Sequence, residues 1–218
     1  MREVADPAPR LLDLSRRLET GMPVFPGDPP VDLAPAAAQP PWQVTRLHLG
    51  THSGTHIDAA SHYVRGGRTI DAYPLERFVL DAYVVHLDAA AEAAIPWEDI
   101  AAQLPVDVAG CAVLVHTGWE RFWGTADAAL HPSLAEDAAG GLAARGVTLV
   151  GTDALNIDAT AAATVFAHAA LLGADVLVVE NLVGLGALAA GRPYCCAFVP
   201  LNVAGGDGSP IRAYARID

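Results

Sequence analysis

A short polar stretch of the sequence, "HLGTHSGTHIDAASH", holds half of the eight histidines of the chain together with one aspartate. These residues are His48, His52, His56, Asp58 and His62. All five fall on even positions, so an extended backbone would direct their side chains to one face. The glycines, serine and threonines between them disfavour a helix, so we expect a strand followed by an irregular loop. Imidazoles and a carboxylate on one face are typical ligands of zinc, manganese and similar ions.

Further ligands are expected from the second half of the chain. Glu180 ends the apolar run 176–179, where a buried charge is costly without a partner. His168 lies on an otherwise apolar segment just before that run, and its alternative interpretation is a hydrogen-bonded core histidine. Asp153 and Asp158 are weaker candidates, because an aspartate in a loop commonly caps backbone amides. The isolated histidines of the chain are expected to be ordinary surface or core residues, and they are His86, His116 and His131.

The elements that must position these residues follow from hydrophobic spacing and turn residues. The proline- and glycine-rich segment 21–30 is expected to be a loop, and 43–52 a half-buried strand. Helices are expected over 133–146, capped by Ser133 and ended by Gly146, and over 159–173. Further strands are expected over 11–15, 77–89, 111–118, 147–154, 174–182 and 194–203. This order predicts a single α/β domain over 1–218, with a mixed sheet and some parallel pairing.

Composition excludes several classes of partner. The chain has 13 basic and 25 acidic residues, a formal charge of −12, which disfavours binding to nucleic acid or to an anionic membrane. The most apolar region, 159–191, is interrupted by charged residues, which argues against a membrane span. The first 18 residues lack the apolar core of a signal peptide. Three cysteines without a pairing pattern favour a reduced, cytoplasmic protein.

The segment "HSGTHIDAASH" resembles the H-x-G-T-H-x-D-x-P-x-H signature of the putative cyclase family, which includes bacterial kynurenine formamidases and isatin hydrolases. Other segments of the chain match that family in the same order, and the resemblance runs from about Leu11 to the C-terminus. Ala60 replaces the proline of the signature, and Phe25 stands where kynurenine formamidases commonly have tryptophan. The matching segments are "PVFPGDPP", "GTDALNID", "HAALLGADVLVVENL" and "CAFVPLNVAGGDGSPIRAYA".

The resemblance implies a swivelling β/β/α fold, assembly into homodimers or homotetramers, and a centre of one or two divalent ions, zinc or alternatively manganese. It implies that His62 is the general acid and base, and that Phe25 contacts a small-molecule substrate. His48 lies outside the signature and receives no role. The implied metal ligands are His52, His56, Asp58, His168 and Glu180, with the two carboxylates able to bridge.

We therefore expect a metal-dependent hydrolase of an amide bond, with metal-activated water as nucleophile and N-formylkynurenine or a related aryl formamide as substrate. A serine hydrolase is disfavoured because the chain has no G-x-S-x-G motif. Two alternatives stay open on the sequence. One is a hydrolase that opens a cyclic amide or lactone, as isatin hydrolase does. The other is a non-catalytic protein that keeps the metal for structure.

Overall fold

A curled, mixed sheet of nine strands forms the centre of the molecule. The computed structural model describes residues 10–161 and 165–217. The order of the strands is β1-β13-β11-β5-β7-β9-β10-β4-β12. Their bounds, in that order, are Leu11–Asp13, Tyr214–Arg216, Tyr194–Ala197, Val79–His86, Ala112–His116, Leu149–Thr152, Leu177–Glu180, His56–Asp58 and Gly208–Pro210. Strands β5, β7, β9 and β10 run parallel and the outer pairs are antiparallel, so the expected α/β architecture with a mixed sheet is confirmed.

The parallel strands β7, β9 and β10 are buried on both faces, which is why they read as continuous apolar runs in the sequence. In β7 the residues alternate between two hydrophobic cores. Val113 and Val115 pack in one core, and Ala112 and Leu114 in the other. The same alternation in β10 places Val178 in one core and its neighbours on the strand in the other. The carboxylate that follows on this strand therefore emerges at the end of a fully packed element.

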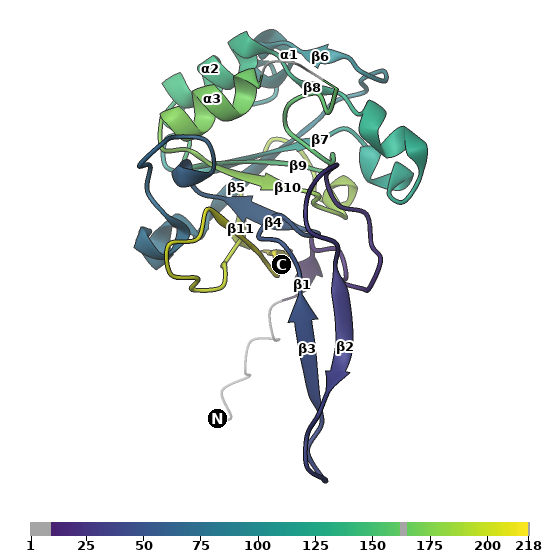
Figure 1. Ribbon diagram of the computed structural model, residues 1–218. Helices are drawn as coiled ribbons and strands as arrows, with labels where there is room; N and C mark the ends of the chain where they lie inside the picture. Colours follow the sequence, from purple (N-terminus) through teal and green to yellow (C-terminus); the bar gives the residue numbers. More distant parts are fainter. Residues whose placement is uncertain (1–9, 162–164, 218) are drawn as a thin grey trace, which may run out of the picture.

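Three helices cover one face of the sheet, as Figure 1 shows. They are α1 (Trp97–Ala101), α2 (Glu136–Ala144) and α3 (Phe166–Gly173). Helices α2 and α3 contribute Leu142 and Leu171 to the core beneath them. A short parallel pair lies beside them, formed by β6 (Ala94–Ile95) and β8 (Ser133–Leu134). The second core is enclosed by the curled sheet itself, with Ile57 of β4 and Ala215 of β13 packed in it.

A two-stranded hairpin projects from the body, away from the helices (Figure 1). It consists of β2 (Asp32–Ala36) and β3 (Val44–His48), and every residue of β3 is exposed. The expectation of a half-buried strand is therefore wrong at this position. The alternating apolar residues of β3 have no sheet beneath them, since β3 pairs with β2 alone.

Both expected helices begin later than their sequence pattern indicates. Ser133 is not an N-cap, because it pairs within β8, and α2 begins only after Ala135. Gly146 follows the end of α2 with a φ of 69°, as a terminating glycine does. The expected helix over 159–173 begins at residue 166, because the preceding loop is used by the site described below; residues 162–164 lie outside the described residues.

The described residues also contain six short 3₁₀ helices. Among the helices in those residues, none combines the length and the hydropathy needed to cross a membrane. The first half of the segment expected to lack a signal peptide, residues 1–9, lies outside the described residues. The 3₁₀ helices span Ala60–His62, Ile70–Ala72, Leu75–Arg77, Trp119–Phe122, Ala126–Leu130 and Leu185–Ala187.

Candidate metal centre

The pairing of β4 with β10 brings the candidate ligands together. The two strands are antiparallel, with His56 opposite Glu180 and Asp58 opposite Val178. His56 and Asp58 are two residues apart on β4, so their side chains share a face. Helix α3 then carries His168 to the same place from the covering layer. Two paired strands and one helix thus direct four side chains to one point.

The histidines converge as their even spacing predicts, but an extended backbone does not bring all of them together. Only His56 and Asp58 lie on one strand. His52 precedes β4 in a turn that uses Gly54 at a φ of 65°, and His62 lies on a 3₁₀ turn. Turns before and after the three residues of β4 therefore bring the histidines together, where a strand followed by an irregular loop was expected. His48 lies on the projecting hairpin, consistent with its having no assigned role.

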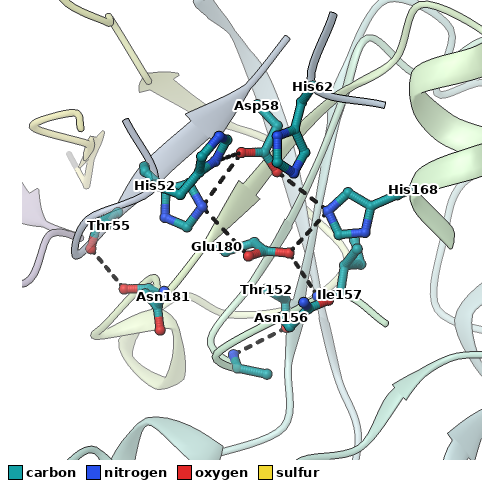
Figure 2. A network of polar contacts seen from close by, with 12 residues as sticks. His52, Thr55, Asp58, His62, Thr152, Asn156, Ile157, His168, Glu180 and Asn181 are labelled. Atoms are coloured by element: carbon teal, nitrogen blue, oxygen red, sulfur yellow. Dashed lines mark hydrogen bonds and ion pairs between the residues drawn. The ribbon is translucent and has the colours of Figure 1, made fainter. Parts of the chain in front are cut away.

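Asp58 and Glu180 lie among His52, His56 and His168. Figure 2 shows the two carboxylates with His52 and His168 beside them. His56 Nε2 is 3.4 Å from Asp58 Oδ1 and 3.5 Å from Glu180 Oε2. His168 Nε2 is 3.5 Å from Asp58 Oδ2 and 3.5 Å from Glu180 Oε1. His52 Nδ1 is 2.7 Å from Asp58 Oδ1, a hydrogen-bonding distance. Each carboxylate therefore turns one oxygen toward His56 and the other toward His168.

These separations fit ligands arranged around cations. Charge-assisted hydrogen bonds are normally about 2.7–2.9 Å long, shorter than the four contacts to His56 and His168. Zinc held at about 2.0–2.1 Å in a tetrahedral site places its ligands about 3.3–3.4 Å apart. Asp58 Oδ2 is buried and has no hydrogen-bond partner among the described residues. A donor set of imidazoles and carboxylates with an unpaired buried oxygen fits a divalent metal.

The remaining ring nitrogens of two of these histidines are hydrogen-bonded away from the centre. His56 Nδ1 donates to the Gly54 carbonyl at 2.9 Å, and His168 Nδ1 is 2.7 Å from Asp158 Oδ2. Such contacts fix the tautomer, so that Nε2 of each ring faces the candidate ligands. Asp158 also accepts from the backbone amides at the start of α3, so its expected capping role is confirmed.

Burial and neighbouring charges shift the pKa values in this centre. Burial lowers the pKa of His56 to about 4, which keeps the imidazole neutral, the form that binds metal. Burial and the negative charge of Asp58 raise the pKa of Glu180 to about 8. Burial also lowers the pKa of His52, but hydrogen bonds and charge from Asp58 and Asp207 outweigh it and raise that pKa to about 9. Without metal, the carboxylates are thus balanced by bound protons.

A cavity of about 280 Å³ opens onto the candidate ligands. Its walls include apolar side chains and the proline-rich loop, which supplies Phe25 and Asp28. His62 also lines the cavity, and its ring centroid lies 4.0 Å from that of His52. The structure therefore places Phe25 and His62 beside the candidate ligands, with His62 on the solvent side at 33% side-chain exposure.

Sequence reasoning missed Asp207, which lies within hydrogen-bonding distance of two histidines of the cluster. Its Oδ2 atom is 3.0 Å from His52 Nε2 and 3.4 Å from His62 Nδ1. A carboxylate between glycines in "GGDGSP" is the only sequence signal for it. Asn181 was missed as well. It lines the cavity with a φ of 60°, and its side-chain oxygen has no hydrogen-bond partner among the described residues.

The isolated histidines and the remaining loop aspartate make their hydrogen bonds outside the candidate centre. Nδ1 of His86 and Nδ1 of His116 lie 2.9 Å apart. His131 is buried and contacts the Pro132 carbonyl and the Thr160 hydroxyl. In the described part of the chain none of these three belongs to a group that could hold a metal, as expected. The remaining candidate, Asp153, is buried and accepts from backbone amides, as a loop aspartate commonly does.

Comparison with known proteins agrees with this geometry. A model of the family described as putative cyclase matches residues 12–159. The chain belongs to the putative cyclase family. Kynurenine formamidase of Paracidovorax citrulli (strain AAC00-1) is 36% identical over 218 residues, which cover 95% of this chain and 97% of the relative. Kynurenine formamidase of Maricaulis maris (strain MCS10) is 35% identical over 214 residues, covering 95% and 98%.

Solved structures of cyclase-family proteins share the fold. Isatin hydrolase A from Labrenzia aggregata, bound to benzyl benzoate, superimposes with a TM-score of 0.85 at 26% identity, covering 95% of this chain and 93% of that one. A potential metal-dependent hydrolase with cyclase activity superimposes with a TM-score of 0.78 at 29% identity, covering 95% and 98%. The family expected from the histidine motif is therefore confirmed.

Proposed function

We propose that the protein is a metal-dependent hydrolase of an amide bond, with N-formylkynurenine or a related aryl formamide as its substrate. The relatives named kynurenine formamidase support hydrolysis of a non-peptide C–N bond. The observation that carries the proposal is the sharing of Asp58 and Glu180 between His56 and His168 beside a cavity. Such an arrangement suits one or two cations next to a bound small molecule.

The proposed ligands fall into two groups that share Asp58. The first is His52, His56 and Asp58, and the second is Asp58, His168 and Glu180. Zn²⁺ is the proposed ion because nitrogen and oxygen donors at these separations suit it; Mn²⁺ accepts the same donors. When bound, the metal supplies an activated water and polarises the carbonyl group of the substrate.

His62 is the proposed proton carrier. It lines the cavity beside the candidate ligands, and a third of its side chain is exposed. Burial lowers its pKa, so the ring is neutral and able to accept a proton at neutral pH. It would take a proton from the attacking water and return it to the nitrogen of the leaving amine.

Phe25 is the proposed contact for the aromatic part of the substrate. It belongs to the proline-rich loop that lines the cavity together with the candidate ligands. An aromatic side chain at such a wall favours a flat apolar ligand. The formamide group would then face the carboxylates, and the ring would face the loop.

Turnover of a panel of formanilides by zinc-loaded protein tests this proposal. Hydrolysis of N-formylkynurenine or of a simpler aryl formamide is the expected result, and the chelated protein is expected to be inactive. His62→Ala should remain metal-loaded and lose most of the turnover. Activity that is unaffected by both metal removal and this substitution would contradict the proposed mechanism.

Opening of a cyclic amide or lactone is the second candidate function, favoured by the structural match to isatin hydrolase A. It requires the same attack on a carbonyl carbon and the same proton carrier. Including isatins in the substrate panel separates the two candidates by their relative kcat/KM. A metal-loaded protein that hydrolyses neither class would favour the third, non-catalytic alternative.

Assembly and location are proposals as well. We propose a homodimer or homotetramer in the cytoplasm, as the family resemblance and the unpaired cysteines indicate. Light scattering of the purified protein measures the first property. A monomer at micromolar concentration would contradict it.

A further inference from the structure

One carboxylate oxygen joins the metal-ligating part of the centre to its proton carrier. Oδ2 of Asp207 is 3.0 Å from His52 Nε2 and 3.4 Å from His62 Nδ1. The two rings lie 4.0 Å apart between centroids. The 3.0 Å contact is a hydrogen-bonding distance, shorter than the 3.4–3.5 Å separations around the candidate cations. Asp207 therefore accepts a hydrogen bond from His52, and it forms a longer one of 3.4 Å with His62.

The fold holds Asp207 in this position through strand pairing. Strand β12 begins directly after it and pairs with β4, with Gly208 opposite Asp58. The Asp207 carbonyl accepts from the Ala59 amide at 2.9 Å, and its Oδ1 accepts from the Thr51 hydroxyl at 2.9 Å. A segment more than 140 residues away in sequence is thus fixed beside the strand that carries the ligands. Residues on paired strands hold geometry better than residues on free loops.

The adjacent glycine allows the close approach of His52. A Cβ atom at Gly208 would lie 2.8 Å from His52 Cε1 and 2.7 Å from the Ile57 carbonyl. Any larger residue would push the ring away from Asp207 or separate β12 from β4. The sequence "DG" therefore places an acceptor and the space for the ring side by side.

We propose that Asp207 is a positioning residue that sets the tautomers of His52 and His62 together. An ionised carboxylate only accepts hydrogen bonds, so each nitrogen facing it carries a hydrogen. In the metal-free protein His52 Nδ1 carries a hydrogen as well, because it lies 2.7 Å from Asp58 Oδ1. A bound metal would replace that hydrogen, and His52 would keep the one on Nε2 that Asp207 accepts. His62 keeps its hydrogen on Nδ1, which leaves Nε2 to accept a proton.

This inference rests on the proposed function for the role of His62, and its test separates the two. Ring ¹⁵N chemical shifts of the zinc-loaded protein report which nitrogen of each histidine is protonated, and they need no substrate. The expected pattern is a protonated Nε2 in His52 and a protonated Nδ1 in His62. In Asp207→Asn, His62 is expected to move toward the Nε2-protonated form.

Zinc affinity and kinetics provide the second readout. Asp207→Asn is expected to weaken zinc binding by about 10–100-fold, measured by chelator competition, because a ligand loses its orienting partner. At saturating zinc, kcat should fall by roughly 10²-fold or more with KM almost unchanged, since Asp207 is not among the described residues that line the cavity. Asp207→Glu, which keeps the carboxylate, should recover part of both properties.

Two further variants keep the inference open to refutation. Thr51→Val leaves the carboxylate but frees it to rotate, so it should shift the same signals by less, even if Asp207→Asn folds poorly. Asp71→Asn is the matched control, because Asp71 accepts a hydrogen bond from Gly205 in the same loop and is not hydrogen-bonded to either ring. Unchanged tautomers and zinc affinity in Asp207→Asn would overturn the inference. If Asp207→Asn binds fewer zinc ions per chain with unchanged affinity, Asp207 is a ligand, and that result would also overturn the inference.

Discussion

Asp58 and Glu180 face each other from neighbouring strands and present their oxygens to the same two histidines. His56 Nε2 lies 3.4 and 3.5 Å from one oxygen of each carboxylate, and His168 Nε2 lies 3.5 Å from the other oxygen of each. Two carboxylates this close repel each other unless positive charge lies between them. The pair therefore offers two adjoining candidate cation positions, in ligand groups that share Asp58, for the one or two ions proposed.

Removal of a shared carboxylate should affect both positions. Purified protein is expected to hold up to two zinc ions per chain after supplementation, and Asp58→Asn to hold less than one. Elemental analysis of the desalted proteins measures this. Asp28→Asn is the control, since Asp28 lines the same cavity without belonging to a ligand group. Full metal content in Asp58→Asn would contradict the shared arrangement.

Loss of the proton carrier should separate catalysis from metal binding. His62→Ala is expected to lower kcat by about 10²–10⁴-fold, because general acid–base catalysis contributes that much. Its metal content should stay at the level of the unmodified protein. His48→Ala, on the exposed strand β3, is the matched control and should change neither property. Loss of metal in His62→Ala would show that His62 is a ligand.

The sequence predicts the members of the centre better than their arrangement. Ligand residue types, short spacing and the carboxylate at the end of a buried run are local signals, and they pointed to His56, Asp58 and Glu180. The pairing of β4 with β10 brings them together, and pairing between distant strands leaves little trace in one sequence. The contact of Asp207 with His52 was missed for the same reason.

Helix starts and exposure were harder to predict. The apolar pattern over 159–173 continues smoothly, yet α3 begins where Asp158 caps its first amides. In β3, alternation predicts a buried face, but the strand belongs to a projecting hairpin with no layer behind it. In both cases tertiary placement overrides a local pattern. The central parallel strands, buried on both faces, were predicted because their apolar runs need no such context.

A methyl group at Gly208 should disturb the candidate metal centre by displacing the His52 ring. Gly208→Ala places a Cβ atom 2.8 Å from His52 Cε1, so it is expected to destabilise the fold by roughly 1–3 kcal/mol and to weaken zinc binding. Gly140→Ala is the control, since its Cβ would meet nothing within 4 Å on α2. That control should stabilise the protein by about 0.5–1 kcal/mol in urea denaturation. Equal effects of the two substitutions would contradict the close packing at His52.

The wall of the cavity should control substrate binding rather than chemistry. Phe25→Ala is expected to raise KM for an aryl formamide by roughly tenfold or more, because it removes apolar contact worth about 1.5–3 kcal/mol. Phe25→Trp should keep KM within a few-fold. Steady-state kinetics on formanilide and on an aliphatic formamide measures the difference. An equal loss on both substrates would indicate that Phe25 only anchors the loop.

The metal-free protein should lose stability as the pH rises from about 6.5 to 9. Burial lowers the pKa of His52, but Asp58 and Asp207 outweigh burial and raise it from 6.5 to about 9. A group that binds its proton more tightly in the folded state stabilises that state fully below its unfolded pKa. The stabilisation is then lost as the pH passes through the folded pKa. Glu180, whose pKa rises from 4.5 to about 8 through burial and the charge of Asp58, acts in the same direction over the lower part of this range.

Zinc should reverse this dependence, because the ion replaces the protons that balance the carboxylates. Thermal denaturation in chelator is expected to give a lower Tm at pH 9 than at pH 6.5, and a smaller or opposite change with zinc bound. His56 titrates near pH 4, outside this window, so it does not contribute. His52→Gln should reduce the slope of the metal-free protein, because one of the groups whose pKa is raised on folding is gone. A metal-free Tm that is constant across the window, or that rises with pH, would contradict the proton-balanced centre.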